Sequence, residues 1–308
     1  MNRGISPALF AACILACVPA VCEQPRAGSF APNAADIMAK VAANQDRAEA
    51  ERAHYVYVQH STMSSRKGKT IQCEEVTDYR ITPSDSGVHD ELVKLDGRLR
   101  VNGSYVTYHS LAPEDSKSGV ENDKDSVSIT IGGDSADRDM VEHMRSNLMH
   151  DKSKDGLNSK LFPLTSKEQA DYNFELAGQE RLNGHDVYHI TFHPKDKDDY
   201  GWKGDAYVDT AAFQPVLVTT AMARKIPFAV RTFLGTNLPG LGFTVVYAPQ
   251  PDGVWFPASF STEFKIHVLY FFHRDIVMDA QNRDFEKTHV TSRMLEEVTP
   301  VDPAKPQQ

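Results

Sequence analysis

Cysteine is scarce in this sequence and is concentrated near one end. Only 4 of the 308 residues are cysteines, and three of them, Cys13, Cys17 and Cys22, lie close to the N-terminus. Cys73 is the only cysteine further along the chain. One cysteine cannot build an internal disulfide framework, so the burial of apolar side chains must hold the fold together. The chain is long enough to bury such a core.

Long apolar runs and an excess of positive charge are also missing. Beyond the N-terminal region, no apolar run approaches the roughly 18 residues that suggest a membrane-spanning helix, so we expect no transmembrane span after the leader. The 33 lysine and arginine residues are outnumbered by 42 aspartate and glutamate residues, which gives a net charge of −9. An acidic chain does not favour nucleic acid as a partner.

Metal-binding patterns are absent as well. The sequence contains neither His-Glu-x-x-His nor Cys-x-x-Cys. The sharpest histidine cluster is His185, His189 and His193, which would share one face of a strand. Neighbours in that series lie about 13 Å apart, at roughly 3.3 Å per residue. One ion with bonds of about 2.0–2.1 Å cannot bridge that distance. We therefore predict no metal site and no cofactor.

Only one stretch is reminiscent of a catalytic motif. Residues 133–136 (GDSA) are similar to the nucleophile block of GDSL-type esterases, with Ser135 as the nucleophile. The second motif of such enzymes, Asp-x-x-His, has only a partial counterpart in residues 286–289 (EKTH). The block lies in a polar segment, whereas a nucleophile needs a rigid frame. We predict no catalytic residues and no enzyme activity, with weak hydrolysis as the third alternative.

The N-terminus has the pattern of an export leader. Arg3 precedes the apolar run Ala8–Val18, which suits a signal peptide and is too short to cross a bilayer. We expect a signal peptide at residues 1–20 with cleavage after Ala20 or slightly later, a linker at 21–34, and a periplasmic protein. An alternative is a lipobox at residues 14–17, in which Cys17 would be lipidated and would anchor the protein to the membrane. Cys22 is a second candidate for lipidation.

The rest of the chain is dominated by β patterns. After a helix at residues 35–52, which Asp36 can cap, the apolar period switches to two. Turn dipeptides then separate strands without βαβ alternation, which indicates an antiparallel sheet. The turns are Asp96-Gly97, Asn102-Gly103, Asn183-Gly184 and Asp252-Gly253. The last strands are predicted at Lys265–Met278 and His289–Met294. We expect about eleven strands, one domain over residues 35–297, and a disordered tail at 298–308.

A polar and helical excursion is expected at about residues 111–170. Its helix, from about Arg138 to Lys152, has an apolar face of Met140, Val141, Met144, Leu148 and Met149. Such a face packs against a core. Because it is rich in methionine, it can also line a tolerant apolar groove.

Two stretches resemble the outer-membrane lipoprotein carrier (LolA/LolB-like) superfamily. The first runs from Phe174-Glu175-Leu176 through Asn183-Gly184 and Tyr188 to residues 203–209 (KGDAYVD) and Pro215-Val216. The second is residues 253–257 (GVWFP). The resemblance implies a mainly β fold, a half-open antiparallel β-barrel wrapped around two or three helices. It also implies an apolar cavity for acyl chains or lipoproteins. The carrier's lid-holding arginine cannot be placed here, since Arg52 and Arg80 both qualify.

The segment from residue 226 to 243 is the best candidate for a ligand site. It combines many apolar residues with three glycines and two prolines, which argues against regular structure. It is therefore either a loop folded over the core or the mouth of a binding site. The predicted ligand contacts are Phe228, Phe233, Leu234, Leu238 and Leu241. We expect an envelope protein that binds or carries a hydrophobic small molecule, lipid or lipoprotein acyl chain, with an envelope protein as a further partner. The alternative is a regulatory or scaffold module with a filled core.

Overall fold

Every described strand pairs with a strand that runs in the opposite direction. The computed structural model describes residues 32–84, 87–110, 136–150, 163–196, 201–223, 236–237, 241–268 and 272–288. The described strands are β1 (Tyr55–Lys67), β2 (Thr70–Ser84), β3 (Gly87–Val101), β4 (Ser104–Ser110), β5 (Tyr172–Leu182), β6 (His185–Pro194), β7 (Trp202–Asp209), β8 (Pro215–Met222), β9 (Thr236–Asn237), β10 (Thr244–Pro249), β11 (Trp255–Val268) and β12 (Phe272–Lys287). The described helices are α1 (Ala34–Arg52), α2 (Ala136–His150) and α3 (Ser166–Gln169).

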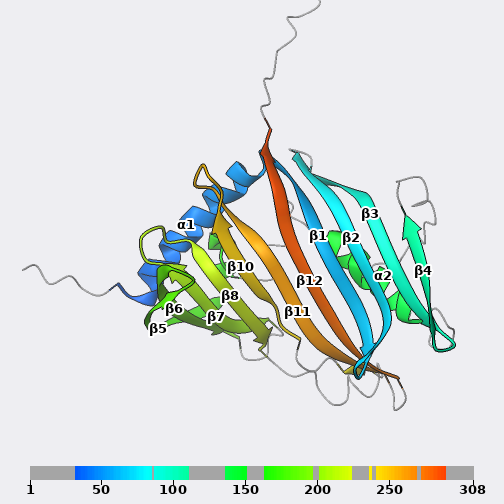
Figure 1. Cartoon of the computed structure of the whole chain (residues 1–308). Helices are drawn as coiled ribbons and strands as arrows, with labels where there is room; N and C mark the ends of the chain where they lie inside the picture. Colours follow the sequence, from blue (N-terminus) through cyan, green and yellow to red (C-terminus); the bar gives the residue numbers. More distant parts are fainter. Residues whose placement is uncertain are drawn as a thin grey trace, which may run out of the picture. The chain divides into compact units, whose positions relative to one another are not determined.

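These strands form one open antiparallel sheet. Their order is β4-β3-β2-β1-β12-β11-β10-β8-β7-β6-β5, and β9 pairs with β11 off this path. The first strand of the chain lies beside the last one described, because β1 pairs with β12 from Tyr55↔Lys287 to Arg66↔Asp275 (Figure 1). The predicted fold class is confirmed: the chain is mainly β, with an open antiparallel sheet and three helices among the described residues. All of these elements belong to the unit Asn33–Gln308.

Three of the four predicted turns are present. Asn102-Gly103 and Asn183-Gly184 take positive φ angles at both residues, as a two-residue hairpin turn requires, and Gly253 has a φ of 88° between β10 and β11. The prediction for Asp96-Gly97 is wrong, because β3 runs straight through both residues. A Cβ atom on Gly97 would lie 2.1 Å from Cζ of Tyr108. Glycine is therefore needed there to let the Tyr108 ring lie across the strand.

Two further boundaries differ from the predictions. The N-cap of α1 is Asn33, whose side chain accepts a hydrogen bond from the backbone N–H of Asp36, so Asp36 lies in the first turn instead of capping the helix. The predicted strand Lys265–Met278 is divided between β11 and β12. Apolar and polar residues alternate in both strands, which is why the sequence pattern does not reveal the division.

Helices α1 and α2 cover the same face of the sheet. Ile37, Met38 and Val41 of α1 pack on β6, β7, β8 and β10, whereas Met140 and Val141 of α2 pack on β1, β2, β11 and β12. Phe260 of β11 packs against buried residues of both groups. The core on this face thus consists of neighbouring clusters, with a separate one under each of the two helices.

Several predictions lie outside the described residues. These are the signal peptide at 1–20, almost all of the 21–34 linker, lipidation of Cys17 or Cys22, Ser135 with its GDSA block, the strand at 289–294 and the tail at 298–308. No described helix has the length and apolar character needed to cross a membrane.

Candidate functional site

An apolar cavity of about 200 Å³ lies between α2 and the sheet. Side chains from five parts of the chain line it: β1, α2, the segment before β10, β11 and β12. The lining residues are Met63, Met144, Leu241, Phe243, Thr262, Phe264, Ile276 and Met278. Three of these eight are methionines, whose flexible thioethers adapt to differently shaped apolar groups.

Strand register brings the floor of the cavity together. β11 and β12 pair Thr262 with Met278 and Phe264 with Ile276, and β1 pairs Met63 with Met278. Because side chains two residues apart on a strand share a face, these five side chains all point toward α2. Four of the five are apolar, so the sheet presents an apolar surface there.

The segment before β10 forms a wall of the cavity. The N–H of Phe243 donates to the carbonyl of Thr220 at 3.2 Å, and the N–H of Met222 donates to the carbonyl of Leu241 at 3.1 Å. A Cβ atom on Gly242 would lie 2.1 Å from the Thr220 carbonyl oxygen, so only glycine allows this close approach to β8. Leu241 and Phe243, on either side of Gly242, both reach the cavity.

The one polar side chain in the lining is already satisfied. The hydroxyl of Thr262 donates to the carbonyl oxygen of Gly242 at 2.7 Å. Among the described residues, the lining therefore offers a ligand apolar side chains and no free polar one.

Helix α2 is fixed to the sheet near its first residues by an ion pair. Arg274 of β12 donates through Nε and Nη2 to the two carboxylate oxygens of Asp137, at 2.5 and 2.7 Å. The hydroxyl of Ser65 on β1 donates to the same carboxylate at 2.5 Å. Both charged side chains are largely buried. Because two parallel hydrogen bonds join the guanidinium to the carboxylate, they fix the orientation of the two groups as well as the distance between them.

A second ion pair holds α2 two turns later. Arg145 donates through Nε to Glu75 of β2 at 2.8 Å and through Nη1 to the hydroxyl of Tyr79 at 2.5 Å. The carboxylate of Glu75 is fully buried and also accepts a hydrogen bond from the Tyr108 hydroxyl at 2.8 Å. Burial raises the pKa of Tyr108 above its usual value, so the phenol stays protonated and remains a donor. Met144 is thereby held over the cavity.

Cys73 lies beside Tyr108 and is expected to be unreactive. Its side chain is fully buried, and burial raises the pKa of the thiol to about 12. Because the thiolate is the reactive form, a thiol with this pKa is not a nucleophile at neutral pH.

Only one of the predicted ligand contacts lies among the described residues, and the prediction stays a prediction. Leu241 lines the cavity, whereas Phe228, Phe233, Leu234 and Leu238 lie outside the described residues. Five lining residues were not predicted from the sequence, namely Met63, Thr262, Phe264, Ile276 and Met278. Alternation along β11 and β12 indicates that these side chains face a core, but not that the core contains a cavity. Met144 lay on the predicted methionine-rich face, and Met140 and Val141 of that face are buried, as predicted.

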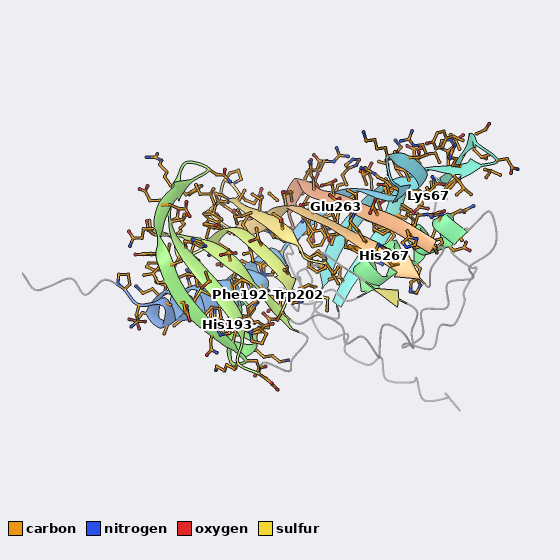
Figure 2. All side chains as sticks on the ribbon, turned by 90° about the horizontal axis from the view of Figure 1, so that it is seen from below. Lys67, Phe192, His193, Trp202, Glu263 and His267 are labelled. Carbon is orange, nitrogen blue, oxygen red and sulfur yellow. The ribbon has the colours of Figure 1, made fainter. Side chains whose placement is uncertain are left out.

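The histidines and arginines singled out in the sequence have structural partners. His185 contacts the Asp209 carboxylate at 2.7 Å and His189 contacts that of Asp205 at 2.8 Å, while His193 is exposed. Figure 2 shows His193 on β6, well away from His267 on β11. Among the described residues, no three metal-ligating side chains are close enough to hold an ion. Arg52 donates to the carbonyl of Trp255 beneath α1, and Arg80 is exposed on β2.

Comparison with known proteins gives distant structural likenesses. No protein-family model matches the sequence, and no curated protein matches it. The chain is similar to a domain from Vibrio parahaemolyticus described as an outer membrane lipoprotein-sorting protein, with 13% identity, 81% of this chain and 92% of that chain covered, and a TM-score of 0.35. It is also similar to a LolA superfamily protein from Nitrosomonas europaea, with 13% identity, 83% and 94% covered, and a TM-score of 0.34.

A DUF1329 family protein from Desulfovibrio piger gives comparable values, with 11% identity, 84% and 95% covered, and a TM-score of 0.37. The superfamily that the sequence resembles is thus represented among similar solved structures. Since these identities and TM-scores are low, they carry no functional argument. What the chain itself defines is an open antiparallel β-sheet protein with an apolar cavity under a helix.

Proposed function

We propose that this chain binds the alkyl part of a hydrophobic ligand in the cavity between α2, the segment before β10, and strands β1, β11 and β12. The observation that supports this proposal is the lining: seven of its eight side chains are apolar, and the eighth, Thr262, has its hydroxyl bonded to a backbone carbonyl. Covering apolar side chains of this kind with an apolar molecule removes both from water, which is favourable. Each buried methylene contributes roughly 0.8 kcal/mol.

Binding without chemistry fits the side chains present. The described lining contains no carboxylate, histidine or free hydroxyl that could act as an acid, base or nucleophile. The nearby Cys73 thiol is buried and protonated. The ligand would be a lipid, an acyl chain or another hydrophobic small molecule, held by burial alone and released unchanged. No cofactor takes part.

The cell envelope is the proposed location. The leader pattern, with Arg3 before an apolar run and small residues behind it, supports export. Hydrophobic molecules need shielding when they move through the aqueous part of the envelope, and a second envelope protein would receive or supply the ligand. Anchoring through a lipidated cysteine is a further proposal that the leader pattern supports.

A scaffold role is the alternative function. It is supported by the way α2 is fixed at both ends of its described face, through Asp137–Arg274 and Arg145–Glu75. A helix held this firmly can serve purely to complete a core. The two functions predict different effects of filling the cavity with a larger side chain. A scaffold would keep or gain stability, whereas a binding protein would lose affinity for its ligand.

Filling the cavity is therefore expected to abolish binding without unfolding the protein. Leu241→Trp and Met144→Trp, which enter from different walls, should each weaken binding of decylphosphocholine by about tenfold or more, because they take the volume of several methylenes. Isothermal titration calorimetry below the critical micelle concentration measures this. Val106→Trp, on the exposed edge strand β4, is the matched control and should bind like the unchanged protein. Absence of heat from the unchanged protein, or equal affinity in all four proteins, would rule out the binding function.

A further inference from the structure

The volume of the cavity limits what can enter it. An apolar cavity of about 150 Å³ in another protein accommodates benzene, which has six carbon atoms. By proportion, a cavity of about 200 Å³ accommodates roughly eight carbon atoms. Two or three complete acyl chains cannot fit in that space.

The cavity is also bounded by filled core on two sides. Met140 of α2 packs against Phe264, Ile276 and their neighbours on one side. Val141 packs against Met63, Met278 and Cys73 on the other. Met140 and Val141 are almost wholly inaccessible to solvent, so the cavity does not open to solvent on these two sides.

Polar anchors oppose enlargement of the cavity. Moving α2 away from the sheet would break the ion pairs Asp137–Arg274 and Arg145–Glu75. The carboxylate of Glu75 is fully buried. Leaving a buried charge without its partner is strongly unfavourable. These two ion pairs therefore hold the α2 wall of the cavity in place.

The lining provides no site for a polar head group. With the Thr262 hydroxyl donated to Gly242, no described lining side chain can pair with a phosphate, a carboxylate or an amine. A charged or zwitterionic head group must remain in solvent, because burying it without a partner is costly.

From these observations we infer that the cavity takes the end of one unbranched alkyl chain, roughly eight carbons long, and that the ligand is a single-chain amphiphile whose head group stays outside. This inference rests on the proposed function and narrows it. It predicts that affinity depends on chain length only until the cavity is full.

A chain-length series tests the inference. Alkylphosphocholines with chains from about six to about fourteen carbons are titrated calorimetrically below their critical micelle concentrations. The dissociation constant should fall about fourfold with each methylene up to roughly eight carbons, which corresponds to about 0.8 kcal/mol per methylene, and then level off. Dihexanoylphosphatidylcholine, with two six-carbon chains, should bind no more than about twofold tighter than hexylphosphocholine, because its second chain finds no space.

Two outcomes would overturn the inference while leaving the proposed function intact. One is a dissociation constant that keeps falling about fourfold per methylene beyond about twelve carbons. The other is a two-chain lipid that binds more than about tenfold tighter than hexylphosphocholine. No binding by any member of the series would instead overturn the proposed function itself.

A variant supplies an independent check on the capacity. Met278→Ala removes a long side chain from the cavity floor, so affinity should continue to rise by two or so further methylenes before it levels off. Met38→Ala, which removes the same side chain from the separate core under α1, should leave the position of the plateau unchanged. A plateau at the same chain length in both variants would contradict the assignment of the site.

Discussion

Replacing Arg145 with methionine is expected to lower the free energy of unfolding by about 3–5 kcal/mol. The loss arises because the fully buried carboxylate of Glu75 is left without its cationic partner. The Tyr79 hydroxyl loses its contact with Arg145 at the same time. Methionine preserves helix propensity and most of the side-chain volume, so the change removes charge with little effect on packing. Urea unfolding followed by circular dichroism gives the free energy.

Arg138→Met is the matched control on the same helix. Arg138 pairs with Glu142 one turn later, and both side chains are substantially exposed, so its removal should cost about 1 kcal/mol or less. Removing both buried charges with Glu75→Gln and Arg145→Met together should restore much of the stability lost in the single variant, since no unpaired charge remains. Equal losses for Arg145→Met and Arg138→Met would show that α2 is not held by the buried pair.

Phe256→Ala is also expected to lower the free energy of unfolding by about 3–5 kcal/mol, but for a different reason. Phe256 is fully buried, and its ring centroid lies 5.0 Å from that of Tyr55, 6.0 Å from that of Tyr57 and 4.6 Å from that of Phe285. Truncation removes three aromatic contacts and leaves a cavity that the paired strands cannot close.

The same substitution separates stability from binding. Phe256 is not among the lining residues of the cavity, so the folded fraction of the variant should bind decylphosphocholine with unchanged affinity. Denaturant unfolding and calorimetry on the same sample measure both quantities. Val93→Ala, at an exposed apolar position of β3, should change stability by under about 0.5 kcal/mol. A loss for Phe256→Ala no larger than that would contradict the packing described for this aromatic cluster.

Local rules predicted much of the fold. Asn102-Gly103 and Asn183-Gly184 specify hairpin turns because their positive φ angles suit asparagine and glycine better than other residues. The rule fails at Asp96-Gly97, since that glycine makes room for the ring of Tyr108 on the neighbouring strand. A close approach between strands cannot be distinguished from a turn without knowledge of the partner strand.

The cavity was predicted only in part, and the reason is again long-range pairing. Leu241 was found because apolar residues on an irregular connection stand out in the sequence. Met63 and Met278 look like ordinary core residues of two distant strands, and only the pairing of β1 with β12 brings them together. Likewise, the pairing of Arg145 with Glu75 depends on where α2 lies on the sheet, which no local pattern specifies.

The most direct test of the account is to observe the cavity methionines while a ligand binds. In protein labelled with ¹³C at the methionine methyl groups, titration with decylphosphocholine should shift the resonances of Met63, Met144 and Met278, because these three side chains line the cavity. The resonance of Met38 should stay in place, because that buried residue belongs to the separate core under α1. Shifts of Met38 without those of the cavity methionines, or no shift of any methyl group at saturating ligand, would contradict the proposal that this cavity binds an alkyl chain.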